Sequence, residues 1–477
     1  MQTPERRPNI VFVITDQQRH DTVGAMGFPY MDTPVLDELV SKGTAFSNTY
    51  VTAPVCSPSR ASLFTGLYPH NSGVLRNDEP WASTWVTDLA DAGYHCVNIG
   101  KMHTHPFEAP LGFHERHVIE NKDRAHPKLP FYLDNWDKAL MARGVVKPDR
   151  RTYRDRPDYN ESLGAFVWEK ERDLHPDIFT GDLACRWLKE WNGDAPFFLE
   201  IGIPGPHPPY DPTEKDVAPY RGRDLPKAIR ADMENQPAVL RRLRENHMRE
   251  DHDAVVHLAE PTEDQKQRQR EHYYANVTMI DEIVGKVRDA LRERGVEDNT
   301  VIIFSSDHGD CLNDHGHSQK WTMYEHSVRV PAIVYDPRVP GQGRVDDLVS
   351  LIDLAPTILE LAGLTPPDWM EARSLKGYLD GTQDAPVREE VYSELARDMI
   401  QDASAFMTMI RRDRFKLVYF LDSEEGQLFD LESDPDELTN LWDDPGHAGI
   451  RHDLTLRLLN WRIESGLEAQ RWIGRAS

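Results

Sequence analysis

The chain has 477 residues, which is enough for a large hydrophobic core and a second, smaller unit. Its 80 acidic residues outnumber the 55 basic ones and give a formal net charge of -25. No Lys- or Arg-rich cluster offsets this surplus, so the composition excludes nucleic acid as a partner and disfavours an anionic membrane surface.

The cysteine content and the first apolar run indicate where the protein works. Four cysteines, at positions 56, 96, 185 and 311, are too few for a disulfide framework in a chain of this length, and they suit a reducing compartment. The first apolar run, 10–15, is too short for a signal-peptide core or a membrane span. We therefore expect a cytoplasmic protein without a membrane anchor.

Short apolar runs rich in Val, Ile and Phe alternate with helical patterns along most of the chain. Each run is followed by a polar or Gly-containing turn, as expected of buried parallel strands. This alternation predicts an α/β fold with a large, mainly parallel, mixed sheet flanked by helices. The predicted strands are 9–15, 94–99, 197–203, 301–305 and 331–335, and the predicted helices include 33–42, 178–191 and 271–294.

The stretch A-P-V-C-S-P-S-R-A-S-L-F-T-G-L-Y-P predicts a helix that begins near Cys56 and ends at Gly66. Pro58 suits the first helical turn, and Arg60 adds a fixed positive charge. The helix N-terminus and the Arg both favour an anion beside Cys56. A cysteine taken alone is more often a small buried hydrophobic residue. Its neighbours here favour a reactive one.

Two charged stretches, 115–176 and 212–270, lack a sustained hydrophobic period. We interpret them as insertions near the mouth of a site. Either insertion could select a substrate or contact a second subunit in a homo-oligomer. A surface loop without a specific role fits their composition equally well.

The hydrophobic pattern changes after a predicted helix at 351–363. Alternating runs at 390–394, 406–411, 415–421 and 427–431 predict an antiparallel sheet, and 452–463 predicts a helix packed on it. We therefore divide the chain into a catalytic domain, 1–375, and a smaller C-terminal subdomain, 376–477.

Four predicted strands end in residues suited to one polar site. Ligands of open α/β sheets bind beyond the carboxyl ends of the strands, so we expect these endings to meet. Any one of them alone could be a cap or a loop hydrogen bond. Lys101 and His103 are two residues apart, so both side chains would face the same way on extended backbone. The endings are Thr15-Asp16-Gln17, Gly100-Lys101-Met102-His103, Gly205-Pro206-His207 and Ser306-Asp307-His308-Gly309.

Some of these residues also have the donor types of a divalent metal site. Asp16 and Asp307 offer hard anionic oxygens. Gln17 offers a neutral carbonyl oxygen, and His308 offers an imidazole nitrogen. Together these four residues predict most of the ligand shell of a divalent metal.

The pattern C-x-P-S-R followed by A-S-x-x-T-G resembles the signature of the type I, formylglycine-dependent sulfatases of the alkaline phosphatase superfamily. The later segments F-K-L-V-Y-F and G-Q-L-F-D-L-E-S-D-P-D-E-L-T-N-L resemble the C-terminal part of that family, so the likeness extends from 8 to about 440. It implies that a formylglycine-generating enzyme oxidises Cys56 to an aldehyde. One hydroxyl of the hydrated aldehyde then attacks sulfur, and a covalent sulfo-enzyme forms.

The resemblance also implies roles for individual residues. Asp16, Gln17, modified residue 56, Asp307 and His308 would bind the metal. Gln17 and His308 depart from the commonest pattern of Asp and Asn, so Mn²⁺ or Zn²⁺ joins Ca²⁺, the usual metal of the family, among the candidates. The implied catalytic residues are Cys56, Arg60, Lys101, His103, His207 and Lys320; Lys101, His207 and Lys320 would also contact the substrate, with Asn77 at its pocket.

The leading hypothesis is hydrolysis of a carbohydrate or aryl sulfate ester. The Gln and His variants resemble those of choline sulfatases and phosphonate monoester hydrolases, so a choline-sulfatase-like enzyme and a phosphonate or phosphate mono- or diesterase remain alternatives. The phosphonate enzymes lack the Lys and His of the G-K-x-H motif, so Lys101 and His103 favour sulfate. A catalytically silent binding protein is a further alternative if Cys56 is never oxidised.

Overall fold

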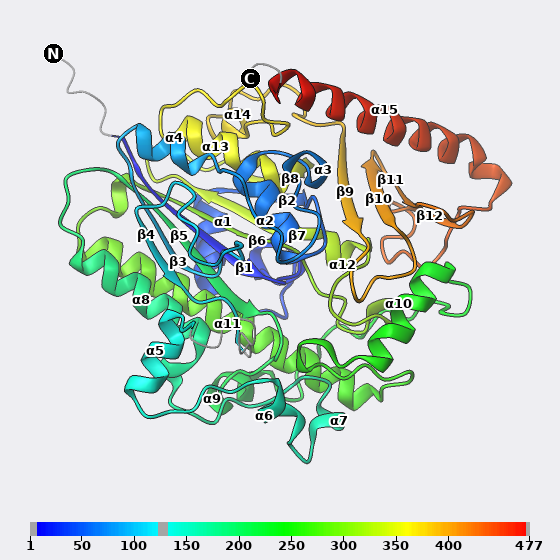
Figure 1. Cartoon of the computed structure of the whole chain (residues 1–477), viewed down its shortest axis with the longest axis horizontal. Helices are drawn as coiled ribbons and strands as arrows, with labels where there is room; N and C mark the ends of the chain where they lie inside the picture. Colours follow the sequence, from blue (N-terminus) through cyan, green and yellow to red (C-terminus); the bar gives the residue numbers. More distant parts are fainter. Residues whose placement is uncertain (1–6, 123–131, 474–477) are drawn as a thin grey trace.

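The computed structural model describes residues 7–122 and 132–473, which form a large mixed sheet between helices and a small antiparallel sheet covered by a long helix (Figure 1). The predicted fold class is therefore confirmed. The division at 375 stays a prediction. Among the described residues, no helix combines the length and apolar character needed to cross a membrane.

The large sheet has eight strands in the order β4-β3-β5-β1-β6-β7-β2-β8. Strands β3, β5, β1 and β6 run parallel to one another and form its centre. The eight strands are β1 (Asn9–Asp16), β2 (Thr44–Tyr50), β3 (His95–Gly100), β4 (Glu115–Val118), β5 (Phe197–Pro206), β6 (Thr300–Ser306), β7 (Arg329–Tyr335) and β8 (Gly343–Ser350).

Three details of the sheet differ from the sequence-based expectation. Strand β7 was expected to be parallel, but it pairs antiparallel with both β6 and β2. Strand β4 lies within the predicted insertion 115–176 and pairs with β3, so the insertion begins after it. Strands β2 and β8 were missed, because β2 is polar (TAFSNTY) and β8 carries two adjacent aspartates. Such strands lack the apolar run on which the prediction relied.

Alternate residues of β1 feed two cores on opposite faces of the sheet. Ile10, Phe12 and Ile14 pack with helices α2, α4 and α13, whereas Val11 and Val13 pack with α1, α8 and α11. This is the period of two expected of a strand buried on both faces. The helices are α1 (Pro34–Lys42), α2 (Cys56–Thr65), α3 (Pro69–Ser72), α4 (Val86–Asp91), α5 (Asn135–Ala142), α6 (Arg150–Arg154), α7 (Tyr159–Ser162), α8 (Pro176–Glu190), α9 (Glu214–Val217), α10 (Ala238–Arg249), α11 (Glu263–Glu293), α12 (Glu325–Val328), α13 (Leu354–Leu361), α14 (Lys376–Leu379) and α15 (Ala448–Ile473).

The C-terminal sheet is antiparallel and has four strands, as predicted, and their order is β12-β11-β10-β9. Helix α15 lies along it at the edge of the molecule (Figure 1). The segments after β4 and after β5 carry α5–α7 and α9 at the bottom of Figure 1, and α10 on the right, below the C-terminal sheet. The strands are β9 (Glu390–Ala396), β10 (Phe406–Arg412), β11 (Phe415–Phe420) and β12 (Gly426–Asp430).

Candidate active site

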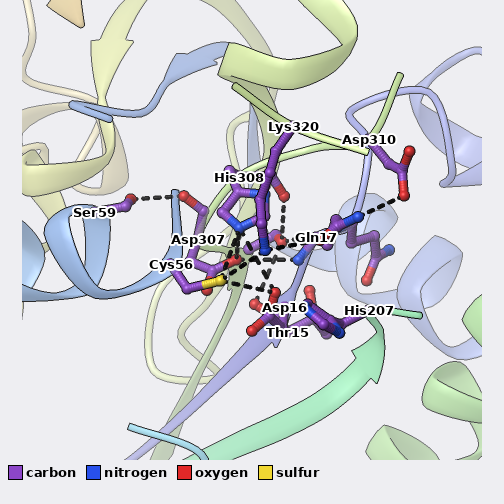
Figure 2. A network of polar contacts seen from close by, with 12 residues as sticks. Thr15, Asp16, Gln17, Cys56, Ser59, His207, Asp307, His308, Asp310 and Lys320 are labelled. Atoms are coloured by element: carbon purple, nitrogen blue, oxygen red, sulfur yellow. Dashed lines mark hydrogen bonds and ion pairs between the residues drawn. The ribbon is translucent and has the colours of Figure 1, made fainter. Parts of the chain in front are cut away.

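The carboxyl ends of the central parallel strands bring most of the predicted residues together (Figure 2). Thr15 of β1 pairs with Ser306 of β6, and Asp16 pairs with Pro206 of β5. The residues that follow these strands, His207 and Asp307, therefore begin at the same edge as Asp16. The expectation that several strand endings meet is confirmed.

Cys56 lies at the first residue of α2, where the sequence predicted a helix start, and Gly66 ends the helix with a left-handed φ of 73°. Cys56 is 1% exposed. Its Sγ is 3.1 Å from Nζ of Lys320, 3.2 Å from Nε2 of His308 and 3.6 Å from Oδ1 of Asp16. Residue 56 is therefore the point at which the charged side chains of this edge converge.

The electrostatics around Cys56 favour an anion. Burial and Asp16 raise the pKa of the thiol, but Lys320, Lys101 and His308 outweigh them and hold the pKa below its ordinary value. Burial likewise raises the pKa of Asp16, but Lys101 and other cations hold it well below the ordinary range. The surrounding cations thus favour the ionised forms of both residues 16 and 56.

Asp16, Cys56, Asp307 and His308 form a buried group whose donor atoms all lie within 4.8 Å of one another. Nδ1 of His308 is 2.9 Å from the carbonyl oxygen of Gly309, which suits a proton on Nδ1, so the neutral ring would present the lone pair of Nε2 to a metal in this group. Carboxylate oxygens and an imidazole nitrogen are common ligands of divalent metals, although Asp307 also pairs with Arg60 and Asp16 with Lys101. The donor set therefore fits a divalent metal.

Gln17 aims a neutral oxygen at the same group. Its backbone N–H donates to Oδ1 of Asp307 at 3.0 Å, and φ is 70°, which is uncommon outside glycine. Nε2 donates to Oδ2 of Asp310 at 2.7 Å, so Oε1 points toward Nζ of Lys320, 3.1 Å away. Asp310, which the sequence analysis missed, thus orients the predicted ligand, and Tyr210 holds Asp310 through a hydrogen bond of 2.7 Å.

Arg60 ties three strand ends together instead of pointing freely at the site. Its Nε donates to Oδ2 of Asp307 at 2.7 Å, and its two terminal nitrogens donate to the carbonyl oxygens of Lys101 and Thr15 at 2.7 and 3.2 Å. Burial disfavours the charge of Arg60, but Asp307 and Asp16 raise its pKa. The geometry makes Arg60 a positioning residue for Asp307.

Lys101 reaches the site from the end of β3, where its Nζ pairs with Oδ2 of Asp16. Its backbone N–H donates to the carbonyl of Gly202 at 2.7 Å, and a Cβ on Gly202 would lie 1.8 Å from the Lys101 oxygen, so glycine is required there. His103 is buried, but its φ is 60°. The backbone at His103 is therefore left-handed, and the extended-chain argument for the Lys101–His103 pair is wrong.

Lys320 is held by a neighbour that the sequence analysis did not single out. Trp321 is 2% exposed, has a φ of 74° and donates from Nε1 to Oδ2 of Asp398 at 2.7 Å. Nζ of Lys320 lies 5.4 Å from the centre of the same indole ring. Asp398 belongs to the segment between β9 and β10, so the C-terminal part of the chain helps to position Lys320.

His207 faces a carboxylate from the second predicted insertion. Its Nδ1 is 2.8 Å from the carbonyl of Pro208, and its Nε2 is 3.4 Å from Oδ2 of Asp253. Arg150, from the first insertion, pairs with the other oxygen of Asp253. Burial and Lys320 lower the pKa of His207 to about 4, against the opposing effect of Asp16 and Asp253. No motif in the sequence identified Asp253; only its place in an insertion near the site pointed to it.

A cavity of about 500 Å³ opens beside these residues. Asn77 lines it and is half-buried, and its Oδ1 accepts a hydrogen bond of 3.1 Å from the backbone N–H of Ser57, next to Cys56. Trp321 and His252 connect the cavity to Lys320 and Asp253. The lining residues are Arg76, Asn77, Asp78, His252, Trp321, Arg397, Asp398, Met399 and Ile400.

Family models match nearly the whole chain. The model described as Sulfatase matches residues 8–364, and the model described as N-sulphoglucosamine sulphohydrolase, C-terminal, matches residues 313–464. An arylsulfatase of Clostridium perfringens (strain 13 / Type A) is 30% identical over 457 residues, which cover 91% of this chain and 90% of that protein.

Solved structures agree with this assignment at the level of the fold. A phosphonate monoester hydrolase of Agrobacterium radiobacter has a TM-score of 0.80 and 26% identity, with 96% of each chain covered. BT4656, solved in complex with its substrate D-glucosamine-2-N,6-O-disulfate, has a TM-score of 0.77 and 21% identity over 98% of this chain and 99% of that one. The chain belongs to the sulfatase family and is a sulfuric ester hydrolase on an alkaline phosphatase-like fold.

Proposed function

We propose that this chain hydrolyses carbohydrate or aryl sulfate esters at residue 56, after Cys56 has been oxidised to formylglycine. The observation that carries the proposal is the convergence on Cys56 Sγ of Lys320, His308 and Asp16, all within 3.6 Å. A thiol used only for packing would lie among apolar side chains. The hydrated aldehyde would supply an oxygen nucleophile for sulfur in place of the thiol.

The metal would be held by Asp16, Gln17, Asp307 and His308 together with an oxygen of residue 56. When bound, it would supply charge stabilisation and lower the pKa of the nucleophilic hydroxyl. Ca²⁺ suits the two carboxylates and the amide, and the imidazole of His308 makes Mn²⁺ the second candidate. Zn²⁺ is the third.

The cationic side chains would hold the sulfate group. Lys101 approaches residue 56 from the end of β3 and Lys320 from the loop between β6 and α12, and their ammonium groups would offset charge on the sulfuryl oxygens. Arg60 would not contact the sulfate group directly; it would position Asp307. His103 is proposed to help remove the second hydroxyl proton when sulfate is released.

His207 would serve the leaving-group oxygen. Because Nδ1 donates its proton to the carbonyl of Pro208, Nε2 would deliver a proton to the leaving group only from the doubly protonated ring, a form that Asp253 favours and that burial and Lys320 disfavour. Asp253 would hold that nitrogen in place until the substrate oxygen approaches it.

The cavity beside Asn77 would hold the alcohol part of the ester. It is lined by charged, polar and apolar side chains, a mixture that suits a sugar or a substituted aromatic ring better than a trimethylammonium group, which needs an aromatic cage. The choline-sulfatase-like alternative is therefore the weaker one.

A phosphonate or phosphate esterase is the second candidate function. The combination of Gln17 and His308 and the likeness to a phosphonate monoester hydrolase favour it. Lys101 beside Asp16 favours sulfate, because a second cation near residue 56 suits the sulfuryl group and is not expected in the phosphonate enzymes.

We further propose maturation by a formylglycine-generating enzyme in the cytoplasm. The four cysteines are all unpaired, as expected of a reducing compartment.

The deciding experiment measures the mass of the peptide around residue 56 and the rates of ester hydrolysis in the same sample. Intact-mass analysis of the peptide around residue 56 should show conversion of the thiol to an aldehyde, and the same sample should cleave aryl sulfates faster than aryl phosphonates. Efficient sulfate hydrolysis by a sample whose Cys56 is wholly unmodified would overturn the nucleophile assignment. A preference for the phosphonate ester would select the second candidate.

A further inference from the structure

Helix α15 carries a second apolar face that no part of the described chain covers. Four large side chains on it are about half exposed: Leu456 at 45%, Leu459 at 54%, Ile463 at 52% and Leu467 at 53%. Their spacing of three, four and four residues places them in one stripe along the helix. We call these four residues the outer stripe.

The inner face of the same helix is already used. Leu454 and Leu458 are buried against the C-terminal sheet, and Trp461 packs beside them. Ser465 contributes a hydrogen bond of 2.7 Å to His70. At 100° per residue, this inner row lies on the opposite side of the helix from the outer stripe. Figure 1 shows α15 at the outer edge of the molecule, with its far side open.

An apolar stripe in water indicates a surface built for contact. It extends over about 16 Å, from Leu456 to Leu467, which is enough for one helix to pack along another. Isolated exposed leucines are ordinary on protein surfaces, but four in helical register on an otherwise charged helix are not.

We propose that the outer stripe packs against the same stripe of a second copy of this chain, with the two α15 helices antiparallel. In that arrangement Leu456 faces Leu467 of the second copy and Leu459 faces Ile463, so every apolar residue meets another. A two-fold axis close to position 461 generates both halves of the contact, as in an isologous dimer.

The charges along the stripe support this occupant and this direction. Arg457 and Glu464 lie seven residues apart on one edge of the stripe. The Arg457 side chain is 36% exposed and also pairs with Asp453 at 2.8 Å and with Glu390 at 3.5 Å, and Glu464 is exposed. An antiparallel pair centred as above sets Arg457 beside Glu464 of the second copy, and symmetry repeats the pair.

The opposite edge of the outer stripe carries small residues. Thr455 and Gly466 lie there, and a Cβ added at Gly466 would meet no atom of the chain within 4 Å. In the same antiparallel register each faces the other across the axis, so the two helices can approach closely. A membrane is the weaker occupant, because the chain has a net charge of -25 and α15 has no basic cluster around the stripe.

The first test is the mass of the full-length protein across a concentration series, by sedimentation velocity. We expect a monomer–dimer equilibrium in the wild type. L459E and I463E should raise the dimer dissociation constant at least about 100-fold, because each substitution acts twice in a symmetric contact. The matched control is L438E, at an exposed leucine elsewhere in the C-terminal part (48% exposed), which should leave the constant unchanged. Circular dichroism of each variant checks that α15 stays folded.

The second test fixes the direction of the helices. R457E and E464R should each weaken the dimer about 10-fold through two like-charge contacts, and the double variant R457E/E464R should restore it. A failure of the double variant to recover would exclude the antiparallel register.

Three outcomes would overturn the proposal: a wild-type monomer at every concentration, a dimer that L459E and I463E leave intact, or a monomer that binds anionic lipid vesicles through the stripe. Sulfatase activity is not a readout here, so the proposal stands or falls independently of the proposed function.

Discussion

The carboxylate of Asp253 lies 3.4 Å from Nε2 of His207. Asp253 belongs to the predicted insertion 212–270, whereas His207 directly follows the central strand β5. Asp253 has a left-handed φ of 54° and is 1% exposed. Burial raises the pKa of its carboxyl, but His252, Arg150 and His207 hold it well below the ordinary range. A strained, buried and charged residue beside the proposed proton donor is typical of a functional position.

Replacing Asp253 with Asn should therefore slow substrates with poor leaving groups. We expect kcat/KM for alkyl sulfates to fall by about 10- to 100-fold, whereas 4-nitrophenyl sulfate, whose leaving group needs no proton, should lose less than about 3-fold. Asp251→Asn is the control, because Asp251 pairs with Arg154 on the surface. Equal losses on both substrates would contradict a role at the leaving group.

Substitution of the proposed nucleophile gives the largest effect. Cys56→Ala should lower turnover of sulfate esters by at least about 1000-fold, because no other group can form the covalent intermediate. Cys185→Ala, at a partly exposed thiol on α8, should retain activity. Steady-state rates and thermal melts of both variants check the prediction. An active, folded Cys56→Ala protein would remove residue 56 from the mechanism.

Substitution of Lys101 distinguishes a sulfatase from a phosphonate esterase. Lys101→Ala should reduce kcat/KM for an aryl sulfate by about 100- to 1000-fold, since it removes a buried cation that pairs with Asp16 beside residue 56. An aryl phosphonate should lose less. Rates of the variant on both esters, with the exposed Lys42→Ala as control, test the assignment. A sulfate rate within 3-fold of the wild type would show that Lys101 does not act on the substrate.

Removal of the proposed metal should lower stability. Chelation leaves Asp16 and Asp307 buried near each other without a shared cation, so the apo protein should unfold more easily. A metal at 100 times its Kd contributes about 2.7 kcal/mol, and thermal melts with EDTA should show a decrease of about 2 °C or more. Adding back Ca²⁺, Mn²⁺ or Zn²⁺ ranks the metals. In Asp307→Asn the shift with EDTA should vanish; its persistence would place the metal elsewhere.

Stability should also fall in mild acid. Burial lowers the pKa of His257 and of His272 to about 4, below the value of about 6.5 expected in the unfolded chain. Between pH 6.5 and 4 the unfolded state therefore binds protons that the folded state does not. Each such histidine lowers the free energy of unfolding by up to about 1.4 kcal/mol per pH unit as the pH falls.

His272→Gln isolates one of these groups. Glutamine can still donate to the carbonyl of Phe166, which Nδ1 of His272 contacts at 2.7 Å, but it does not titrate. Urea denaturation at pH 7 and pH 5 should show a smaller loss of stability in the variant than in the wild type. Identical losses in the two proteins would rule out a contribution from His272.

The sequence by itself determined the α/β class, the central strands and the helix that begins at Cys56. These features follow from local patterns: a run of apolar residues specifies a buried strand, and a proline followed by a glycine at the right spacing specifies a short helix. It also predicted that Asp16 and Asp307 meet, because the carboxyl ends of parallel strands share one edge. The polar strand β2 and the antiparallel direction of β7 carry no such local signal, since pairing partners are chosen across the sheet.

Only the tertiary structure decided how the site is held together. Arg60 fits the sequence motif as a free cation, but its hydrogen bonds to Asp307 and two strand-end carbonyls make it a brace. Asp253 and Asp398 belong to no motif, yet they reach His207 and, through Trp321, the neighbourhood of Lys320. Contacts between residues so distant in sequence depend on the packing of whole segments, which no local spacing encodes. The proposed chemistry at residue 56 therefore rests on a pattern in the sequence, whereas the residues that position its side chain are set by the fold.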